Sequence, residues 1–444
     1  MVISRQLMAA YEPYVRSLEM LAGTVLNGRK PPIEEKDFAA LLDGHPGSRL
    51  RDLIPLATRK ASGAFFTGST LASRAMDQIA HTIGPQSILL DPTCGVGDLL
   101  VAAARHLPVD VDLGVTITKW GRQIHGFDIF PEFVRAAKAR LVLLASTTNG
   151  SSAHEPALNC PDTFPGLAVG DGIGATVLAS RASHILLNPP YPRVPAPKGC
   201  AWGSGQVSQA AVFLDACLEA ATPGARIVAI LPDVLRTGSL YARWRAMVEA
   251  RAGVDSVQVY GAFDAWADVD VFVLHLIVGS GNPTVNVAWW RPAEAAATGR
   301  VSEHFDVHVG PVVPHRHKGR GTWHPYVYAS RLPAWEEFES DESGKRRFVG
   351  RTFVPPFVTV RRTSAPRDQR RAVGTIVNGK RPVAVENHLL VLVPRDSDLE
   401  RCHQLLTVLR DQRTSDWLNE RIRCRHLTVG ALRELPWWSP PSEQ

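Results

Sequence analysis

Apolar positions along the chain follow two different spacings, and these spacings predict most of its elements. In residues 1–60 they recur every three or four positions, as on one face of an amphipathic helix. We therefore expect a helical lead-in that is too short to form a catalytic domain of its own. A further helix is expected over residues 71–83, with Ser69 or Thr70 as its N-terminal cap.

From residue 87 onward, short apolar runs alternate with helix-like stretches. This alternation predicts an α/β fold, with a mostly parallel sheet covered by helices on both faces. No helix separates the last two strands, so that pair should be antiparallel and the sheet of about seven strands should be mixed. The expected strands are 87–90, 123–127, 167–169, 185–187, 226–231, 257–260 and 269–278, and the expected helices are 99–107, 131–144, 209–221 and 241–252.

Polar residues follow four of these strands, which is where open α/β sheets bind ligands. Asp91, Asp128 and Asp171 end three strands, and Asn188 ends a fourth. Asp128 is suited to ribose hydroxyls and Asp171 to an adenine amino group, although each aspartate could instead only form a turn. The sequence has no phosphate-binding GK[ST] loop here, so we expect a nucleoside ligand without a triphosphate.

Composition limits the class of protein. The 444 residues are 45% apolar and 21% charged, as in soluble globular proteins, and no run approaches a membrane span. The six cysteines show neither a disulfide framework nor metal-ligand spacing, so no metal is expected. We therefore expect a cytoplasmic protein with reduced thiols.

The net charge of +6 lies entirely in the last third, since residues 301–444 hold 23 basic and 17 acidic residues. This bias is typical of a module that faces nucleic acid, although the excess of Arg over Lys could also reflect genomic base composition. Periodicity weakens near 285–310, where we place a domain boundary. Short β-like runs (354–360 and 389–393) and two helical stretches within 398–423 follow.

An arginine-rich segment lies between these two β-like runs. We interpret it as a loop that contacts the DNA backbone or reads bases, and the alternative is a solvated surface. Its five candidate residues are Arg361, Arg362, Arg367, Arg370 and Arg371.

In combination, four motifs resemble one family. They are residues 63–70 (GAFFTGST), the loop 91–98 (DPTCGVGD), the acids Asp128 and Asp171, and the quartet 188–191 (NPPY). In this order they are similar to the γ-class (TaqI-like) DNA adenine-N6 methyltransferases and to the modification subunits of restriction systems. The resemblance spans roughly residues 60–280, with a looser match in the C-terminal part.

The resemblance implies a methyltransferase fold, Rossmann-like with a mixed seven-stranded sheet, that uses S-adenosylmethionine. It implies a methyltransferase domain over 61–285 after the lead-in 1–60, and an α+β target-recognition domain that binds DNA over 300–444. The implied cofactor-binding residues are Phe66, Thr67, Asp91, Thr93, Gly95, Gly97, Asp128, Ile129, Asp171 and Gly172. The chain departs from the family at Phe66-Thr67-Gly68, where Tyr-Thr-Pro is usual, and at Asp98, where a small residue is common.

The implied catalytic residues are Asn188, Pro189, Pro190 and Tyr191. An adenine N6 amine is a poor nucleophile, and two acceptors, the Asn188 side-chain oxygen and the Pro189 carbonyl, can hold its hydrogens while the prolines stiffen the backbone. Tyr191 offers a ring on which a flipped base can stack. A second ring, Trp266 or Phe263, would face it, with Trp266 the better match in spacing; core filling is the alternative for each.

We expect residues 192–208, with three glycines and an exposed Trp202, to form a mobile loop beside the site that could close over DNA; a disordered connector is the alternative. The expected partner is double-stranded DNA, and a separately encoded restriction endonuclease is compatible with the resemblance, as is a place at the nucleoid of a prokaryote. Three readings compete: methylation of RNA bases or of a protein glutamine, a non-catalytic DNA-binding protein with this fold, and a nucleotide-dependent oxidoreductase.

Overall fold

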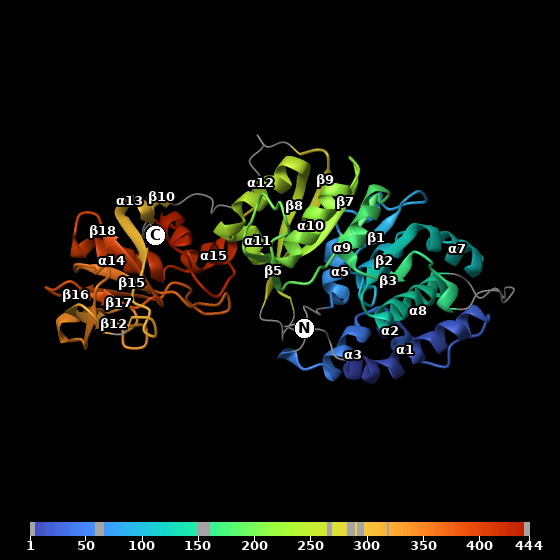
Figure 1. The fold of residues 1–444 in the computed structure, drawn as a ribbon, viewed down its shortest axis with the longest axis horizontal. Helices are drawn as coiled ribbons and strands as arrows, with labels where there is room; N and C mark the ends of the chain where they lie inside the picture. Colours follow the sequence, from blue (N-terminus) through green and yellow to red (C-terminus); the bar gives the residue numbers. More distant parts are fainter. Residues whose placement is uncertain are drawn as a thin grey trace, which may run out of the picture. The chain divides into compact units, whose positions relative to one another are not determined.

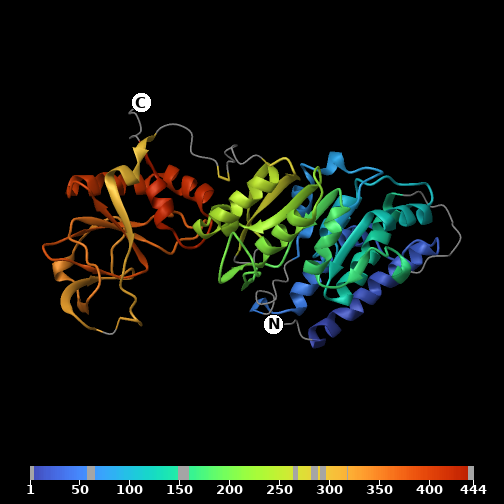
Figure 2. The ribbon, with the colours of Figure 1, turned by 45° about the horizontal axis from the view of Figure 1, so that its top comes forward.

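The computed structural model describes residues 5–57, 66–148, 160–263, 269–281, 289–290, 297–317 and 319–438. The chain forms two compact units. The first contains residues 1–236 and 240–288, and the second contains residues 237–239 and 289–444. Figures 1 and 2 show the elements of both units.

The first unit is built on a seven-stranded sheet with the order β3-β2-β1-β4-β7-β9-β8. The five strands from β3 to β7 are parallel, whereas β9 runs antiparallel to both β7 and β8. The predicted mixed sheet and its antiparallel last pair are therefore confirmed. Its strands are β1 (Leu89–Asp91), β2 (Ile124–Asp128), β3 (Leu167–Val169), β4 (His184–Leu187), β7 (Arg226–Pro232), β8 (Ala252–Ala262) and β9 (Asp270–Val278).

The direction of the crossovers places helices on both faces of the sheet. From β1 the chain moves outward through β2 and β3, and from β4 it moves in the other direction to β7. Because crossovers between parallel strands are right-handed, the helices of the first series and the helix between β4 and β7 cover opposite faces. The helices concerned are α6 (Asp98–Ala104), α7 (Leu113–Gln123) and α8 (Pro131–Thr148) in the first series and α10 (Gln209–Ala220) in the second.

Three N-terminal helices, α1 (Arg5–Leu26), α2 (Glu35–Leu42) and α3 (His45–Leu53), confirm the helical lead-in. In Figures 1 and 2, α1 lies along α8. Its inward face shares a core with the sheet helices, and Arg135 of α8 binds Glu12 and Glu19 at 2.8 and 2.5 Å. The lead-in is thus packed into the first unit.

Two local expectations are wrong. Helix α5 (Gly68–Met76) begins before Ser69 and Thr70, so neither residue caps it, and Thr67 at the cap position makes no side-chain capping bond. Helix α7 was not predicted at all. Its N-cap, Asp112, accepts a hydrogen bond from the Val115 N–H at 3.0 Å.

Residues 193–208 form a hairpin instead of the expected mobile loop. Strand β5 (Arg193–Pro195) pairs antiparallel with β6 (Gln206–Ser208). Trp202 is 4% exposed, and its indole N–H donates to the Asp215 carboxylate at 2.7 Å. The expectation of an exposed tryptophan is therefore wrong, because burial of the ring and this hydrogen bond anchor the segment. The unit also contains α9 (Gly172–Ala175), α11 (Asp233–Thr237) and α12 (Ala242–Arg251).

The second unit is an α+β structure with two main sheets. The five-stranded sheet has the order β11-β18-β15-β16-β13, and the three-stranded sheet has the order β14-β12-β17. Its strands are β10 (Ala297–Arg300), β11 (Phe305–Val309), β12 (Thr322–Val327), β13 (Glu337–Glu339), β14 (Lys345–Phe348), β15 (Phe357–Arg361), β16 (Gly374–Asn378), β17 (Ala384–Val385), β18 (Leu389–Pro394) and β19 (Pro436–Trp438).

Helices α13 (Val301–His304), α14 (Leu399–Arg410), α15 (Gln412–Arg421) and α16 (Val429–Glu434) complete this unit. Apolar residues of α14, α15 and α16 form a core with the face of the larger sheet that carries Val358 and Leu390. The predicted β runs and the two predicted helices are present in this unit. Within the described parts of the chain, no helix combines the length and the apolar character that a membrane span requires.

Candidate active site

A pocket opens where the strand order of the first unit reverses. The chain leaves β1 in one direction and β4 in the other, so a crevice forms outside the carboxyl ends of these neighbouring strands. The crevice holds about 910 Å³ of empty space, part of it open to solvent. Residues at the ends of four strands line it: Asp91, Asp128, Gly170, Asp171 and Asn188.

Two carboxyl groups stand in the wall of this pocket: Asp91 is buried and Asp128 is half-buried. Burial raises the pKa of Asp91 to about 7, although the Thr93 N–H donates to its side chain at 2.9 Å. Burial likewise raises the pKa of Asp128 to about 6. A cationic ligand in the pocket would stabilise the ionised form of both groups.

Asp128 also fixes the glycine loop between β1 and α6. Its carboxylate accepts the Gly95 N–H at 3.2 Å and the Phe130 N–H at 2.9 Å. Gly172, across the pocket, permits a second close approach, because a Cβ there would lie 1.9 Å from the Pro92 carbonyl oxygen. The backbone of three strand ends is therefore held tightly around the ligand space.

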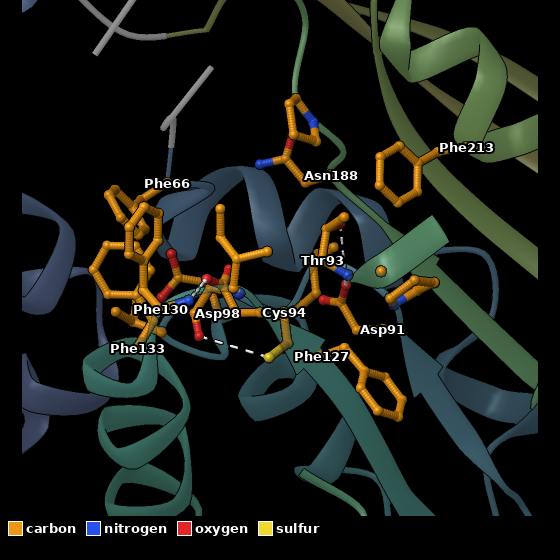
Figure 3. A pocket seen from close by; sticks show the side chains of 18 of the residues that line it. Phe66, Asp91, Thr93, Cys94, Asp98, Phe127, Phe130, Phe133, Asn188 and Phe213 are labelled. Carbon is orange, nitrogen blue, oxygen red and sulfur yellow. Dashed lines mark hydrogen bonds between the residues drawn. The ribbon is translucent and has the colours of Figure 1, made fainter. Parts of the chain in front are cut away.

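Aromatic rings form another part of the wall. Figure 3 shows Phe66, Phe130 and Phe133 together on one side of the pocket, away from Asp91 and Thr93. The Phe66 and Phe133 rings meet edge to face at 5.3 Å between centroids. This side can pack against an apolar or flat part of a ligand, while the opposite side presents polar groups.

Most residues predicted to bind the cofactor meet in this pocket. Of the ten, nine line it, and Gly97 lies just behind, where its φ of 84° suits glycine. Asp171 is exposed and caps α9 by accepting the Ile173 N–H at 3.0 Å. The turn-forming role considered for Asp171 is thus present, together with a position at the pocket wall.

Asn188 is held at the rim of the pocket by two side chains. Its amide donates to the Thr67 hydroxyl at 2.9 Å, and its side-chain oxygen accepts the Tyr191 hydroxyl at 2.9 Å. Burial raises the pKa of Tyr191, so this hydroxyl remains a donor at neutral pH. The arrangement fixes the orientation of the Asn188 amide, and Pro190 also lines the pocket whereas Pro189 is buried.

Of the two aromatic candidates opposite Tyr191, the structure describes one. The Phe263 ring lies edge to face with Tyr191, with centroids 6.0 Å apart, and it is 6% exposed. In this structure the Phe263 ring therefore packs as a core side chain, which is the alternative to stacking on a base. Trp266 lies outside the described residues.

Asp98, where the chain departs from the family pattern, connects the core to the pocket. One carboxylate oxygen binds the Arg140 guanidinium at 2.7 Å, and both side chains are buried. The other oxygen accepts the Gly68 N–H at 3.1 Å, directly after Thr67. A chain of contacts thus runs from Arg140 through Asp98 and the backbone of residues 67–68 to Asn188.

The sequence interpretation missed several residues of the site. Those that line the pocket are Cys94, Phe127, Phe130, Phe133, Gln209 and Phe213. Phe127 and Phe130 flank Asp128, so their proximity to a predicted strand end was a usable signal. Nothing in the sequence pairs Arg140 with Asp98, because 42 residues separate them.

The arginine segment of the second unit is only partly exposed. Arg371 is completely buried and donates to Ser364 at 3.1 Å, to Asn419 at 2.6 Å and to the carbonyls of Ile422 and Cys424. Its interpretation as a DNA-contacting surface residue is therefore corrected: four partners around the guanidinium make it a structural side chain.

Three of the other four arginines also contact their own unit. Arg361 donates to the Leu332 carbonyl at 3.2 Å, Arg362 donates to the Asn387 carbonyl at 3.5 Å, and Arg370 binds the Gln412 side chain. Arg367 is exposed. Arg370 and Arg371 thus connect the run to α15 and the residues after it, whereas Arg361 and Arg362 contact the backbone at Leu332 and Asn387.

No protein-family model matches the sequence, and no curated protein matches it. Solved structures with a similar arrangement include a modification subunit of a putative type I restriction enzyme from Vibrio vulnificus YJ016, with 18% identity over 53% of this chain and 50% of that one and a TM-score of 0.39. The type IIG restriction endonuclease BpuSI is similar at 14% identity over 98% of this chain and 68% of that one, with a TM-score of 0.48.

The EcoKI M protein of a type I restriction enzyme is similar at 16% identity, over 62% of this chain and 64% of that one, with a TM-score of 0.38. These three neighbours are proteins of restriction-modification systems.

Proposed function

We propose that the chain is an S-adenosylmethionine-dependent methyltransferase that methylates the N6 amine of an adenine flipped out of duplex DNA, in a restriction-modification context. The observation that carries this proposal is the position of Asn188. Its side-chain amide stands at the rim of a pocket whose walls hold the shielded carboxyl groups Asp91 and Asp128. An acceptor for the target amine therefore lies next to a site for a cationic nucleoside.

The donor set fits S-adenosylmethionine, which would supply a methyl group on a positively charged sulfur. Asp128 would accept ribose hydroxyls, and Asp171 would accept the adenine amine. Asp91 adds negative charge deep in the pocket, where a cation is favoured. Phe66 and Phe130 provide flat apolar surface beside these groups.

Asn188 and Pro189 would act on the target amine through their oxygens. Accepting both amine hydrogens would favour a pyramidal nitrogen whose lone pair points into the pocket. In the state seen here, the Asn188 oxygen already accepts the Tyr191 hydroxyl. Binding of an amine would therefore require the Tyr191 hydroxyl to turn away or the oxygen to accept two hydrogen bonds, which its two lone pairs allow.

The proposal is tested by incubating the full chain with labelled S-adenosylmethionine and, in parallel reactions, with duplex DNA, with RNA or with a protein that carries an accessible glutamine. The nucleic acids are then digested to nucleosides. Label on N6-methyl-2′-deoxyadenosine is expected. Label found only on RNA or on protein would overturn the proposed substrate. Binding of S-adenosylmethionine and DNA without any transfer would instead indicate a non-catalytic DNA-binding protein with this fold.

Two replacements of Tyr191 should distinguish the role of its ring from the role of its hydroxyl. Tyr191→Phe keeps the ring and should retain capture of the flipped base, while transfer should fall modestly because the Asn188 oxygen loses the hydroxyl that helps to orient it. Tyr191→Ala removes the stacking surface and should weaken capture of the flipped base by about 1–3 kcal/mol. Binding to duplexes that contain 2-aminopurine at the target position, followed by fluorescence, measures this difference. Equal fluorescence enhancement by the two variants would remove Tyr191 from base stacking.

Cofactor binding should release protons near neutral pH. The pKa values of about 6 for Asp128 and about 7 for Asp91 are raised by burial, so both groups are partly protonated there. A bound cation favours the ionised carboxylates and lowers both pKa values, so affinity should increase as pH rises through this range and level off above it.

Calorimetry at about pH 6.5 in buffers of different ionisation enthalpy measures this release. Asp128→Asn should reduce the number of protons released. Asp162→Asn, which replaces an exposed carboxylate of the same unit, should leave that number unchanged. Proton uptake on binding would contradict the assignment.

A further inference from the structure

Two segments of the second unit contain no acidic residue. Residues 311–335 and 345–364 together carry ten Lys and Arg residues, more positive charge than the net +6 of the whole chain. The sequence analysis singled out only the end of the second segment. The remainder of this charge therefore has no role in the site described above.

The fold brings these two segments side by side. Strand β12 pairs antiparallel with β14, and in this register Trp323 stands opposite Arg347. Next to this pair lies a hollow that we call the β12–β14 groove. It is lined by Pro311, Arg316, His317, Arg320, Arg347, Phe348, Val349 and Gly350.

One arginine builds the groove and three are presented in it. Arg346 lies over the Tyr326 ring at 5.2 Å and donates to the Pro314 and His317 carbonyls at 3.0 and 2.7 Å, which fixes the neighbouring loop. Arg316 and Arg320 are exposed, and within the described residues no hydrogen bond or ion pair involves their side chains.

Among the described residues, Arg347 uses only one of its donor groups, Nε, which donates to the Gly321 carbonyl at 2.9 Å. Among the residues that line the groove there is no carboxylate to neutralise these cations. Three guanidinium groups with free donors in one hollow favour a ligand with several anionic oxygens, because the guanidinium fork matches phosphate geometry.

The rim of the groove also exposes apolar surface. Trp323 is 65% exposed and Val349 is 76% exposed. An exposed tryptophan among arginines is typical of surfaces that contact nucleic acid, where the ring packs on a sugar or a base and the cations bind phosphates. An acidic protein segment would also bind these cations, but it would not explain the exposed tryptophan ring beside them.

We infer that the β12–β14 groove is the surface with which the second unit binds the phosphate backbone of duplex DNA. This inference rests on the proposed function, which makes DNA the substrate. It moves the main backbone contact away from the run 361–371, where Arg371 is buried and Arg361, Arg362 and Arg370 hold other parts of the unit.

The test is the salt dependence of duplex DNA binding by Arg316→Ala/Arg320→Ala in the full chain. Both side chains are exposed, and among the described residues neither makes a hydrogen bond or an ion pair, so the variant should fold. Each lost phosphate contact reduces the slope of log K against log salt by about 0.9, so the slope should decrease by roughly 2 between about 50 and 200 mM salt. Trp323→Ala should weaken binding with little change in slope.

A matched control is Arg395→Ala/Arg401→Ala, which removes two arginines of the same unit that pair with Asp306 and Asp396. This control should keep the original slope. Polyglutamate serves as the probe for an acidic protein segment. The inference would be overturned by an unchanged slope in Arg316→Ala/Arg320→Ala, or if this variant lost polyglutamate binding while its DNA binding stayed intact.

Failure of the proposed function looks different from failure of this surface. If the wild-type chain binds S-adenosylmethionine but transfers no methyl group to DNA, the activity is wrong, while a reduced slope in the groove variant still supports the surface. If transfer occurs and the groove variant binds and methylates DNA like the wild type, only the surface is wrong.

Discussion

Asn188→Ala should reduce methyl transfer to DNA by at least about 100-fold, the cost of losing one oriented hydrogen-bonding group that acts in the transition state. The variant should still bind S-adenosylmethionine, because the acids of the pocket remain. Single-turnover transfer of labelled methyl, with cofactor affinity determined by calorimetry, measures both quantities. The expected pattern is a large fall in the rate constant and a small change in the dissociation constant.

Two further variants make this result specific. Asn27→Ala removes an exposed asparagine at the end of α1 and should leave transfer unchanged. Thr67→Val removes the hydroxyl that accepts the Asn188 amide, so it should lower the rate less than Asn188→Ala does. Wild-type transfer by Asn188→Ala would exclude Asn188 as the acceptor of the target amine.

Asp98→Ala should destabilise the first unit by about 3–5 kcal/mol, because it leaves the Arg140 guanidinium buried without its carboxylate. Urea unfolding monitored by fluorescence measures this loss. As a control in the same unit, Asp112→Ala removes the α7 cap and should cost about 0.5–2 kcal/mol. Equal losses in the two variants would contradict a special role for the buried pair.

The double variant Asp98→Leu/Arg140→Met separates stability from positioning. Replacement of a buried ion pair by apolar side chains of similar size is often neutral or stabilising, so the fold should recover. The Gly68 N–H would still lack its acceptor, since that contact comes from the second Asp98 oxygen. Cofactor affinity and methyl transfer should therefore stay reduced, and full recovery of both would reduce Asp98 to a packing residue.

The order of elements in the first unit was accessible from local patterns. Apolar runs such as residues 226–231 are long enough to define a strand, and the polar residue after each run marks its carboxyl end. Because parallel strands share one edge, Asp91, Asp128, Asp171 and Asn188 could be predicted to lie together, and all four line one pocket. Helix α7 was not predicted, because the spacing of the apolar residues in 113–123 was not recognised as that of a helix.

Side-chain burial was much less accessible. Trp202 lies among glycines and looked exposed, but its ring is buried and bonded to Asp215. Arg371 belongs to a run of arginines that looked like a DNA-binding loop, but it is completely buried. In both cases the partners are distant in sequence, and local composition carries no information about them.

The sequence by itself determined the succession of strands and helices along the chain and the polar residues that follow the strands. It also determined the surplus of positive charge in the last third. Each of these features depends only on residues that are neighbours in the sequence. Tertiary structure alone decided which charges are free and which are paired. It turned Asp98 and Arg371 inward, and it brought Arg316, Arg320 and Arg347 into one groove. The physical reason is that a charge is buried or exposed according to partners that only folding brings close.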